Sequence, residues 1–143
     1  MLSAFYAEPI TAAADAVWPY VAWESLELML PGGLFQGVVY ERREPTPGAT
    51  RRVQLAGGLD VVEQLIEQDA TARRVRYRMI DLGAAPLSEY EGDVVVTPRG
   101  PRACALRLAC RYYPLSDDAP DFAPMYREMQ RAFVTFIRSQ VET

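Results

Sequence analysis

The acidic residues of segment 58–69, GLDVVEQLIEQD, are the first candidates for chemistry in this sequence. In an extended strand, Glu63 and Glu67 share one face with Val61 and Leu65, because side chains alternate between the two faces. Each face therefore carries both apolar and polar residues. If the face of Glu63 is turned inward, a carboxyl group lies in an apolar interior, which is typical of a catalytic or ligand-binding site. If it is turned outward, Glu63 is a solvated surface charge.

An inward Glu63 would be suited to acid–base chemistry. Burial of an isolated carboxylate disfavours its charged form, so the group could act as a general acid or base near neutral pH. Tyr77 and Tyr90, on the two following strand-like segments, could donate hydrogen bonds to it, to water or to a substrate carbonyl. These groups would suffice for enolisation, aldol-type cyclisation or dehydration of an oxygenated hydrophobic compound, and we expect no cofactor. They would equally suffice for binding alone.

The composition excludes most other kinds of active site. The chain contains no histidine, no lysine and no asparagine, so every basic residue is an arginine. This removes Ser-His and Cys-His nucleophiles, lysine Schiff bases, histidine metal sites and the P-loop lysine. Cys104 and Cys110 share one face of a single predicted strand, too far apart for a disulfide. We expect them to be small buried hydrophobes, and we expect no metal site.

The 143 residues, half of them hydrophobic, predict one domain spanning residues 1–143. With a net charge of −4 and acids near the arginine pairs, we expect no nucleic-acid binding. The pairs, including Arg51-Arg52, are interpreted as solvated strand ends. No apolar run is long enough to span a membrane, and the N-terminus lacks the pattern of a signal peptide, so we expect a cytoplasmic protein. The sequence leaves a homodimer open.

Alternation and turn signals predict a strand, two short helices, six further strands and a long C-terminal helix. Thr11 is the predicted N-cap of the first helix, which Pro19 is expected to interrupt. The second helix should end at Pro31-Gly32-Gly33. The strands are predicted at 2–8, 35–43, 50–56, 59–68, 73–81, 88–97 and 103–113.

The closing segment, residues 121–143, has the period of an amphipathic helix of about 30 Å. Asp121 is its predicted cap, and Pro124 is tolerable in the first turn. A helix of this length can lie across a whole sheet and cover a pocket. Its predicted apolar face consists of Met125, Met129, Ala132, Phe133 and Phe136.

Charged residues on two adjacent strands indicate which face of the sheet is solvent-exposed. Three arginines share one face of strand 73–81, and three acids share one face of strand 88–97. Because such cross-strand pairs are favourable by a few tenths of a kcal/mol each, both faces should be solvent-facing, which places Tyr77 and Tyr90 inside. The residues are Arg74, Arg76, Arg78, Glu89, Glu91 and Asp93.

The register of strand 59–68 is left open by its residues. An even-length loop to the next strand would put Glu63 and Glu67 beside the outward arginines, and an odd-length loop would put Glu63 beside Tyr77, inside. The residues alone mildly favour the register with salt pairing.

The element order and several motifs resemble those of the SRPBCC superfamily, the START-like group that includes polyketide cyclases, lipid-transfer proteins and plant abscisic-acid receptors. The resemblance covers nearly the whole chain, through ADAVWPYVAWESLELMLPGG, the stretch from PGATRRVQLAGG to EYEGDVVV, and RYYP. Its most specific part is the ordered set Glu63, Asp69, Tyr77, Pro86 and Tyr90. It implies an α+β helix-grip fold, in which a curved antiparallel seven-stranded sheet wraps around the long C-terminal helix, with two short helices after the first strand.

The resemblance also implies an internal ligand cavity. It makes Glu63, Tyr77 and Tyr90 pocket residues, turns Glu63 inward, and places Gly57-Gly58 and Pro86-Leu87 in two flexible loops at the mouth. The other expected lining residues are Trp23, Leu108, Met125, Met129 and Phe133. We therefore expect a protein that binds a small hydrophobic molecule, polyketide-, aromatic- or lipid-like, as lipid-transport proteins do. The alternative is a polyketide cyclase or dehydratase with Glu63 as general acid or base and the tyrosines as hydrogen-bond donors, so whether it is an enzyme stays open.

Overall fold

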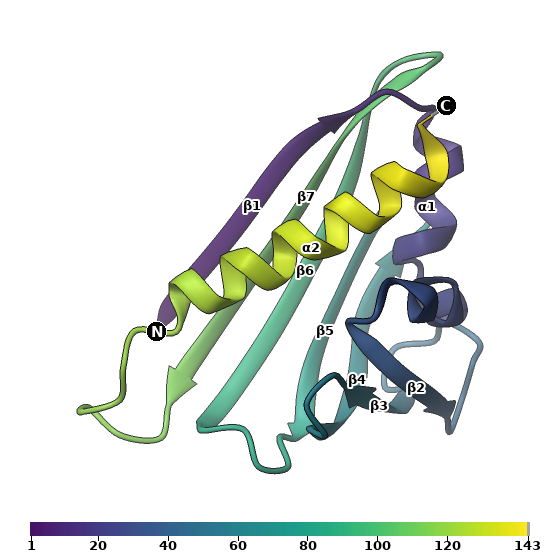
Figure 1. Ribbon diagram of the computed structural model, residues 1–143. Coiled ribbons are helices and arrows are strands. Elements are labelled where there is room, and N and C mark those ends of the chain that lie inside the picture. The colour runs from purple at the N-terminus through teal and green to yellow at the C-terminus, as the bar shows by residue number, and fades with distance from the viewer. Residues whose placement is uncertain (143) are drawn as a thin grey trace.

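Seven antiparallel strands in the order β1-β7-β6-β5-β4-β3-β2 form one sheet in the computed structural model, which describes residues 1–142. The strands are β1 (Leu2–Ile10), β2 (Phe35–Tyr40), β3 (Thr50–Leu55), β4 (Asp60–Asp69), β5 (Arg74–Asp81), β6 (Leu87–Gly100) and β7 (Ala103–Pro114). The helix α1 (Ala14–Val21) and the 3-10 segment η1 (Trp23–Gly32) connect β1 to β2, and α2 (Ala123–Val141) closes the chain. Helix α2 runs diagonally across one face of the curved sheet (Figure 1). This is the helix-grip fold that the sequence predicts.

The start of α1 differs from the prediction. The helix begins at Ala14, with Ala13 in the N-cap position, and the backbone N–H of Thr11 instead donates to Glu142 Oε2 at 2.8 Å. Pro19 lies inside α1 rather than ending it. A proline removes one backbone hydrogen bond, here in a short helix whose Val17 and Val21 are buried against the core. Burial of that face sustains the helix through the proline.

The buried side of α2 is also turned relative to the predicted apolar face. Ala132, Met125 and Met129 are all exposed. The buried residues are Ala123, Gln130, Val134 and Ile137, in a stripe with helical spacing that a glutamine interrupts. Phe122, not the predicted Asp121, occupies the N-cap position of α2. The Asp121 carboxylate accepts the N–H of Ala123 at 3.0 Å, one residue before that position.

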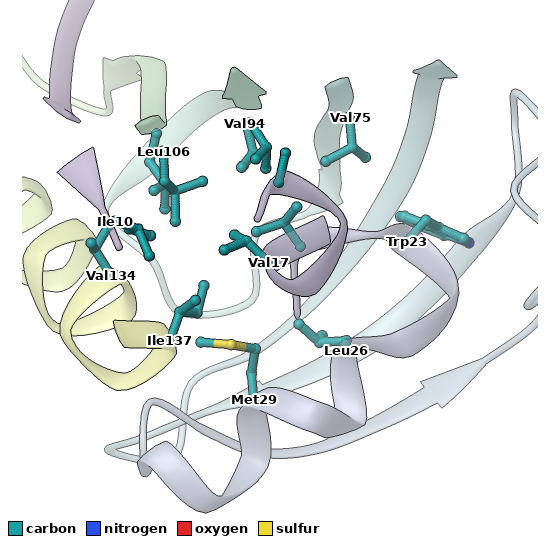
Figure 2. Close-up of a cluster of buried hydrophobic side chains, with 14 of the residues drawn as sticks. Ile10, Val17, Trp23, Leu26, Met29, Val75, Val94, Leu106, Val134 and Ile137 are labelled. Carbon is teal, nitrogen blue, oxygen red and sulfur yellow. The ribbon is translucent and has the colours of Figure 1, made fainter. Parts of the chain in front are cut away.

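Two hydrophobic clusters lie between α2 and the sheet. The larger one joins α1, η1, the C-terminal half of α2 and the strands, with Ile10, Val17, Leu106, Val134 and Ile137 side by side in Figure 2. Each such buried side chain stabilises the fold by about 1.5–3 kcal/mol. The smaller cluster gathers at the other end of the helix. Its buried members are Ala4, Leu87, Cys110, Tyr112 and Ala123.

Strand β4 changes face partway along its length. Val61, Glu63 and Leu65 are buried, whereas Glu67 is exposed. In the ladder with β5, Leu65 pairs with Tyr77 but Glu67 pairs with Arg76, so Ile66 is an extra residue in a β-bulge. The premise that Glu63 and Glu67 share a face is therefore wrong. Glu67 takes the register beside the arginines, while Glu63 lies inside.

The charged outer face of the sheet agrees with the prediction. Arg74 and Asp93 form a two-pronged ion pair, with nitrogen–oxygen distances of 3.0 and 2.7 Å. Arg111 of β7 pairs with Glu91 of β6 at 2.5 Å. Among residues 1–142, no helix is long and apolar enough to cross a membrane.

Candidate functional site

A cavity of about 360 Å³ lies between α2 and the sheet. Its lining comes from α1, η1, strands β2 to β7, α2 and the loops between them. Residues of both hydrophobic clusters line this cavity, which therefore lies between the two clusters. This volume lies within the range of small-molecule sites.

Nine of the twelve residues that the sequence singles out lie on the wall of this cavity. The sheet and its loops supply Glu63, Tyr77, Pro86, Leu87, Tyr90 and Leu108, and α2 supplies Met125, Met129 and Phe133. Trp23, Gly57 and Gly58 do not line it. The two glycines form the exposed turn between β3 and β4, with positive φ values of 85° and 84°. Their neighbours Ala56 and Leu59 reach the cavity instead.

The polar centre of the wall is a buried ion pair between Arg51 of β3 and Glu63 of β4. These residues are direct partners in the antiparallel ladder. Both Nε and Nη2 of Arg51 lie 2.8 Å from the same carboxylate oxygen, Glu63 Oε1. The two side chains are 7% and 6% exposed, so the pair is screened little by water. The interpretation of Arg51 as a solvated strand end is wrong.

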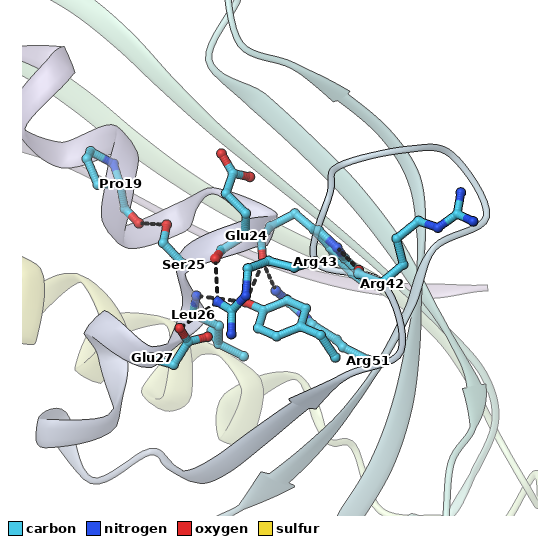
Figure 3. Close-up of polar contacts among 10 residues, drawn as sticks. Pro19, Glu24, Ser25, Leu26, Glu27, Arg42, Arg43 and Arg51 are labelled. Carbon is cyan, nitrogen blue, oxygen red and sulfur yellow. Dashed lines mark hydrogen bonds and ion pairs between the residues drawn. The ribbon is translucent and has the colours of Figure 1, made fainter.

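Trp23 contacts the Arg51 side of this ion pair in two ways. The carbonyl of Trp23 accepts a hydrogen bond from Arg51 Nη1 at 2.7 Å, and its indole ring stacks on the guanidinium at 4.1 Å. The hydroxyl of Tyr40 donates to the same carbonyl at 2.7 Å and accepts from the N–H of Leu26 at 3.1 Å. Figure 3 shows Arg51 reaching from β3 to the start of η1 beside Leu26. Trp23 thus positions Arg51 rather than meeting a ligand.

The sequence contains a pattern that indicates the inward position of Arg51. Along β3, Arg51 alternates in step with Val53, which is fully buried, while Arg52 and Gln54 are exposed. The period of two therefore places Arg51 on the inner face. The ion pair also corrects the expectation of an isolated carboxyl group at Glu63.

Tyr77 and Tyr90 both line the cavity, and the centroids of their rings are 6.4 Å apart. Burial raises the pKa of Tyr77, the nearby charge of Glu63 raises it further, and Arg51 partly offsets these effects. Burial likewise raises the pKa of Tyr90 well above its ordinary value. Both phenols therefore stay protonated near neutral pH and can donate hydrogen bonds into the cavity.

Gly92 makes room for the Tyr77 ring. The two residues are partners in the β5–β6 ladder, and a Cβ atom on Gly92 would lie 2.3 Å from Tyr77 Cζ. Any side chain at this position would force the phenol out of its place. The glycine is therefore required here for a close approach rather than for a turn.

Gln130 of α2 is a further polar lining residue that the sequence analysis did not predict. It is 7% exposed, and its Nε2 donates to the Ala4 carbonyl at 3.2 Å and lies 3.8 Å from Cys110 Sγ. Among residues 1–142, its Oε1 has no hydrogen-bond partner. Cys104 and Cys110 are buried free thiols, as predicted, and burial raises the pKa of both.

Metal ligands are not grouped in the described part of the chain. Between residues 1 and 142, no three or more His, Cys, Asp or Glu side chains are placed to hold one ion. What the cavity offers is one neutralised ion pair, protonated phenols and an amide within apolar walls.

Alkaline titration should report on the buried phenols. Because burial raises the pKa of Tyr77, Tyr90 and Tyr126, the folded state binds more protons than the unfolded state above the ordinary value of 10.0. Their contribution to stability is complete below about pH 10 and is lost as the pH rises further. We expect the free energy of unfolding to fall by up to about 1.4 kcal/mol per pH unit for each phenol.

Urea denaturation at a series of pH values from 8 to 12 measures this slope. The chain has no lysine, so no side-chain ammonium titrates in the same range. Tyr90→Phe should make the slope shallower. Stability that is constant or rising between pH 10 and 12 would contradict the raised pKa values.

The curved sheet that grips a long helix around an internal cavity defines a helix-grip protein. A family model described as "Polyketide cyclase / dehydrase and lipid transport" matches residues 4–142, and the chain belongs to this family. The SRPBCC resemblance is thereby confirmed. A comparison with curated proteins found no match.

Solved structures with the same fold cover nearly the whole chain. The protein XoxI from Bacillus cereus has a TM-score of 0.82 at 12% identity, covering 99% of this chain and 96% of its own. Norcoclaurine synthase from Thalictrum flavum, in complex with dopamine and hydroxybenzaldehyde, has a TM-score of 0.68 at 18% identity, covering 99% and 89%. A Thermobifida fusca protein has a TM-score of 0.67 at 24% identity, covering 99% and 85%. At these identities the likeness establishes the fold alone.

Proposed function

We propose that this protein binds one small hydrophobic or aromatic molecule in the cavity between α2 and the sheet. The observation that carries the proposal is the cavity of about 360 Å³ with mostly apolar walls and a few convergent polar groups. Such a composition is characteristic of sites that enclose a small apolar ligand and orient it by one or two hydrogen bonds. The family description, which includes lipid transport, supports the same reading.

Two methionines of α2 give the cavity wall a surface that can bind apolar ligands. Met125 and Met129 line the cavity while remaining 49% and 37% exposed, so they stand at its edge. Methionine side chains are flexible and polarisable and adapt to ligands of different shape. We infer that the ligand passes beside this part of α2.

Binding of N-phenyl-1-naphthylamine, an uncharged fluorescent probe, tests the proposal. We expect saturable binding at one site and at least tenfold weaker binding by Met129→Glu, which sets a charge on the apolar wall. Ala132→Glu is the matched control, because Ala132 is exposed on the same helix and does not line the cavity. Its affinity should stay within twofold of the original. Equal loss in both variants, or no saturable binding at all, would contradict the proposal.

Catalysis is a second candidate, favoured by the presence of Glu63, Tyr77 and Tyr90 on one wall. A carboxylate base beside phenol donors is suited to removing a proton next to a ketone, the step that begins enolisation, cyclisation or dehydration. In this form of the hypothesis Glu63 acts as a charged base rather than as an acid.

Hydrogen–deuterium exchange next to the carbonyl of 2-tetralone, followed by NMR, separates the two candidates. An enzyme should accelerate exchange, and Glu63→Gln should remove the acceleration while neutral probes still bind. Glu67→Gln, on the outer face of the same strand, should leave it unchanged. Exchange no faster than in buffer, together with probe binding, would leave binding as the function.

A further inference from the structure

We propose that the cavity selects uncharged ligands because the charges of Arg51 and Glu63 on its wall neutralise each other. The proposal rests on the function proposed above and narrows its ligand class. Of the described residues that line the cavity, Arg51 and Glu63 are the charged ones, and their charges cancel. The wall as a whole is therefore polar in places but carries no net charge.

The polar capacity of Arg51 is already largely used within the protein. Its Nε and Nη2 contact Glu63, its Nη1 contacts the Trp23 carbonyl, and one face of the guanidinium is covered by the indole of Trp23. A ligand carboxylate would have to displace Glu63 or lie beside its negative charge. A ligand ammonium that approached Glu63 would meet Arg51 in the same way.

Charged ligands would also lose their hydration without compensation. Removing an ion from water into an apolar cavity is costly unless a counter-charge is available there, and the pair offers none. Neutral oxygen groups are treated differently. A ketone or alcohol can accept a hydrogen bond from the Tyr77 or Tyr90 phenol, which carries its proton at neutral pH. The ligand class that fits is an uncharged aromatic or alicyclic ketone or alcohol.

Three naphthalene compounds of nearly equal shape test the selection. At pH 7, 2-naphthalenemethanol is neutral, 2-naphthoate is an anion and 2-naphthylmethylammonium is a cation. In competition with N-phenyl-1-naphthylamine, we expect the alcohol to bind at least tenfold more tightly than either ion. Equal or tighter binding of an ion would overturn the inference and leave the proposed function standing. Failure of the fluorescent probe itself to bind would overturn both.

Removing one charge of the pair tests whether neutralisation sets the selection. In Glu63→Gln the charge of Arg51 is uncompensated, so 2-naphthoate should gain about tenfold in affinity relative to the alcohol. Glu67→Gln makes the same chemical change outside the cavity and should leave the ratio unaltered. An unchanged ratio in Glu63→Gln would overturn the role of the pair.

The double variant Arg51→Met with Glu63→Leu tests the neutrality of the wall without leaving an unpaired buried charge. It removes both charges together and replaces the pair with apolar side chains, a change that folded proteins often tolerate. Because its wall is still neutral, the double variant should retain the preference for the alcohol. A shift toward either ion would contradict the inference.

Discussion

Arg51→Met should lower the free energy of unfolding by about 3–5 kcal/mol, because it leaves Glu63 buried without its counter-charge. The substitution also removes the hydrogen bond to the Trp23 carbonyl and the stacking on the Trp23 indole. Methionine keeps most of the side-chain volume, so the loss reports on charge and hydrogen bonding rather than on a void. Urea denaturation followed by circular dichroism at pH 7 measures the difference.

Two further variants make this result specific. Arg52→Met changes the neighbouring arginine, which is exposed and lies 3.5 Å from Asp60, and should cost no more than about 1 kcal/mol. The double variant Arg51→Met with Glu63→Leu should recover most of the loss, because no unpaired charge remains. If Arg51→Met were as stable as Arg52→Met, the ion pair would not be buried as described.

Gly92→Ala should weaken binding of N-phenyl-1-naphthylamine at least tenfold. The new methyl group would lie 2.3 Å from Tyr77 Cζ, so the phenol must swing away from the sheet. The space open to it is the cavity, which Tyr77 lines. The expected cost in stability is smaller, about 1–3 kcal/mol, because the far end of a side chain can move while the backbone stays in place.

The same substitution in a Tyr77→Ala background is the matched control. Without the ring there is no clash, so adding Gly92→Ala should change probe affinity by less than twofold. The difference between the two backgrounds is the coupling between Gly92 and Tyr77. Equal effects of Gly92→Ala in both backgrounds would show that the glycine does not act through the ring.

Family membership by itself does not choose between binding and catalysis, because one fold can host both. The ion pair of Glu63 with Arg51 bears on the choice between binding and catalysis. An ion-paired carboxylate must be released from Arg51, or act through its second oxygen, before it can take a proton. This requirement favours binding as the first proposal.

Local sequence patterns were sufficient to predict the strands of this fold. The strands lie within three residues of their predicted ends, because alternation of side chains and the Gly and Pro turns are properties of short stretches. The outward arginines of β5 and acids of β6 were also predictable from alternation alone. The errors at Pro19 and Ala132 depended on which face of a helix is buried, and tertiary packing decided that. The error at Thr11 arose because its backbone N–H is bound by Glu142, 131 residues away in the sequence.

The sequence alone predicted part of the cavity wall, whereas the tertiary structure added Arg51 and Gln130 and decided how the residues meet. Glu63 and Glu67 are alike in their local pattern, and a single bulged residue, Ile66, sends one inward and the other outward. Arg51 lies twelve residues before Glu63, and only the pairing of β3 with β4 brings their charges together. Whether a charge can be buried depends on where its partner lies. That is a property of strand register, which one extra residue can reverse, and not of the stretch that contains the charge.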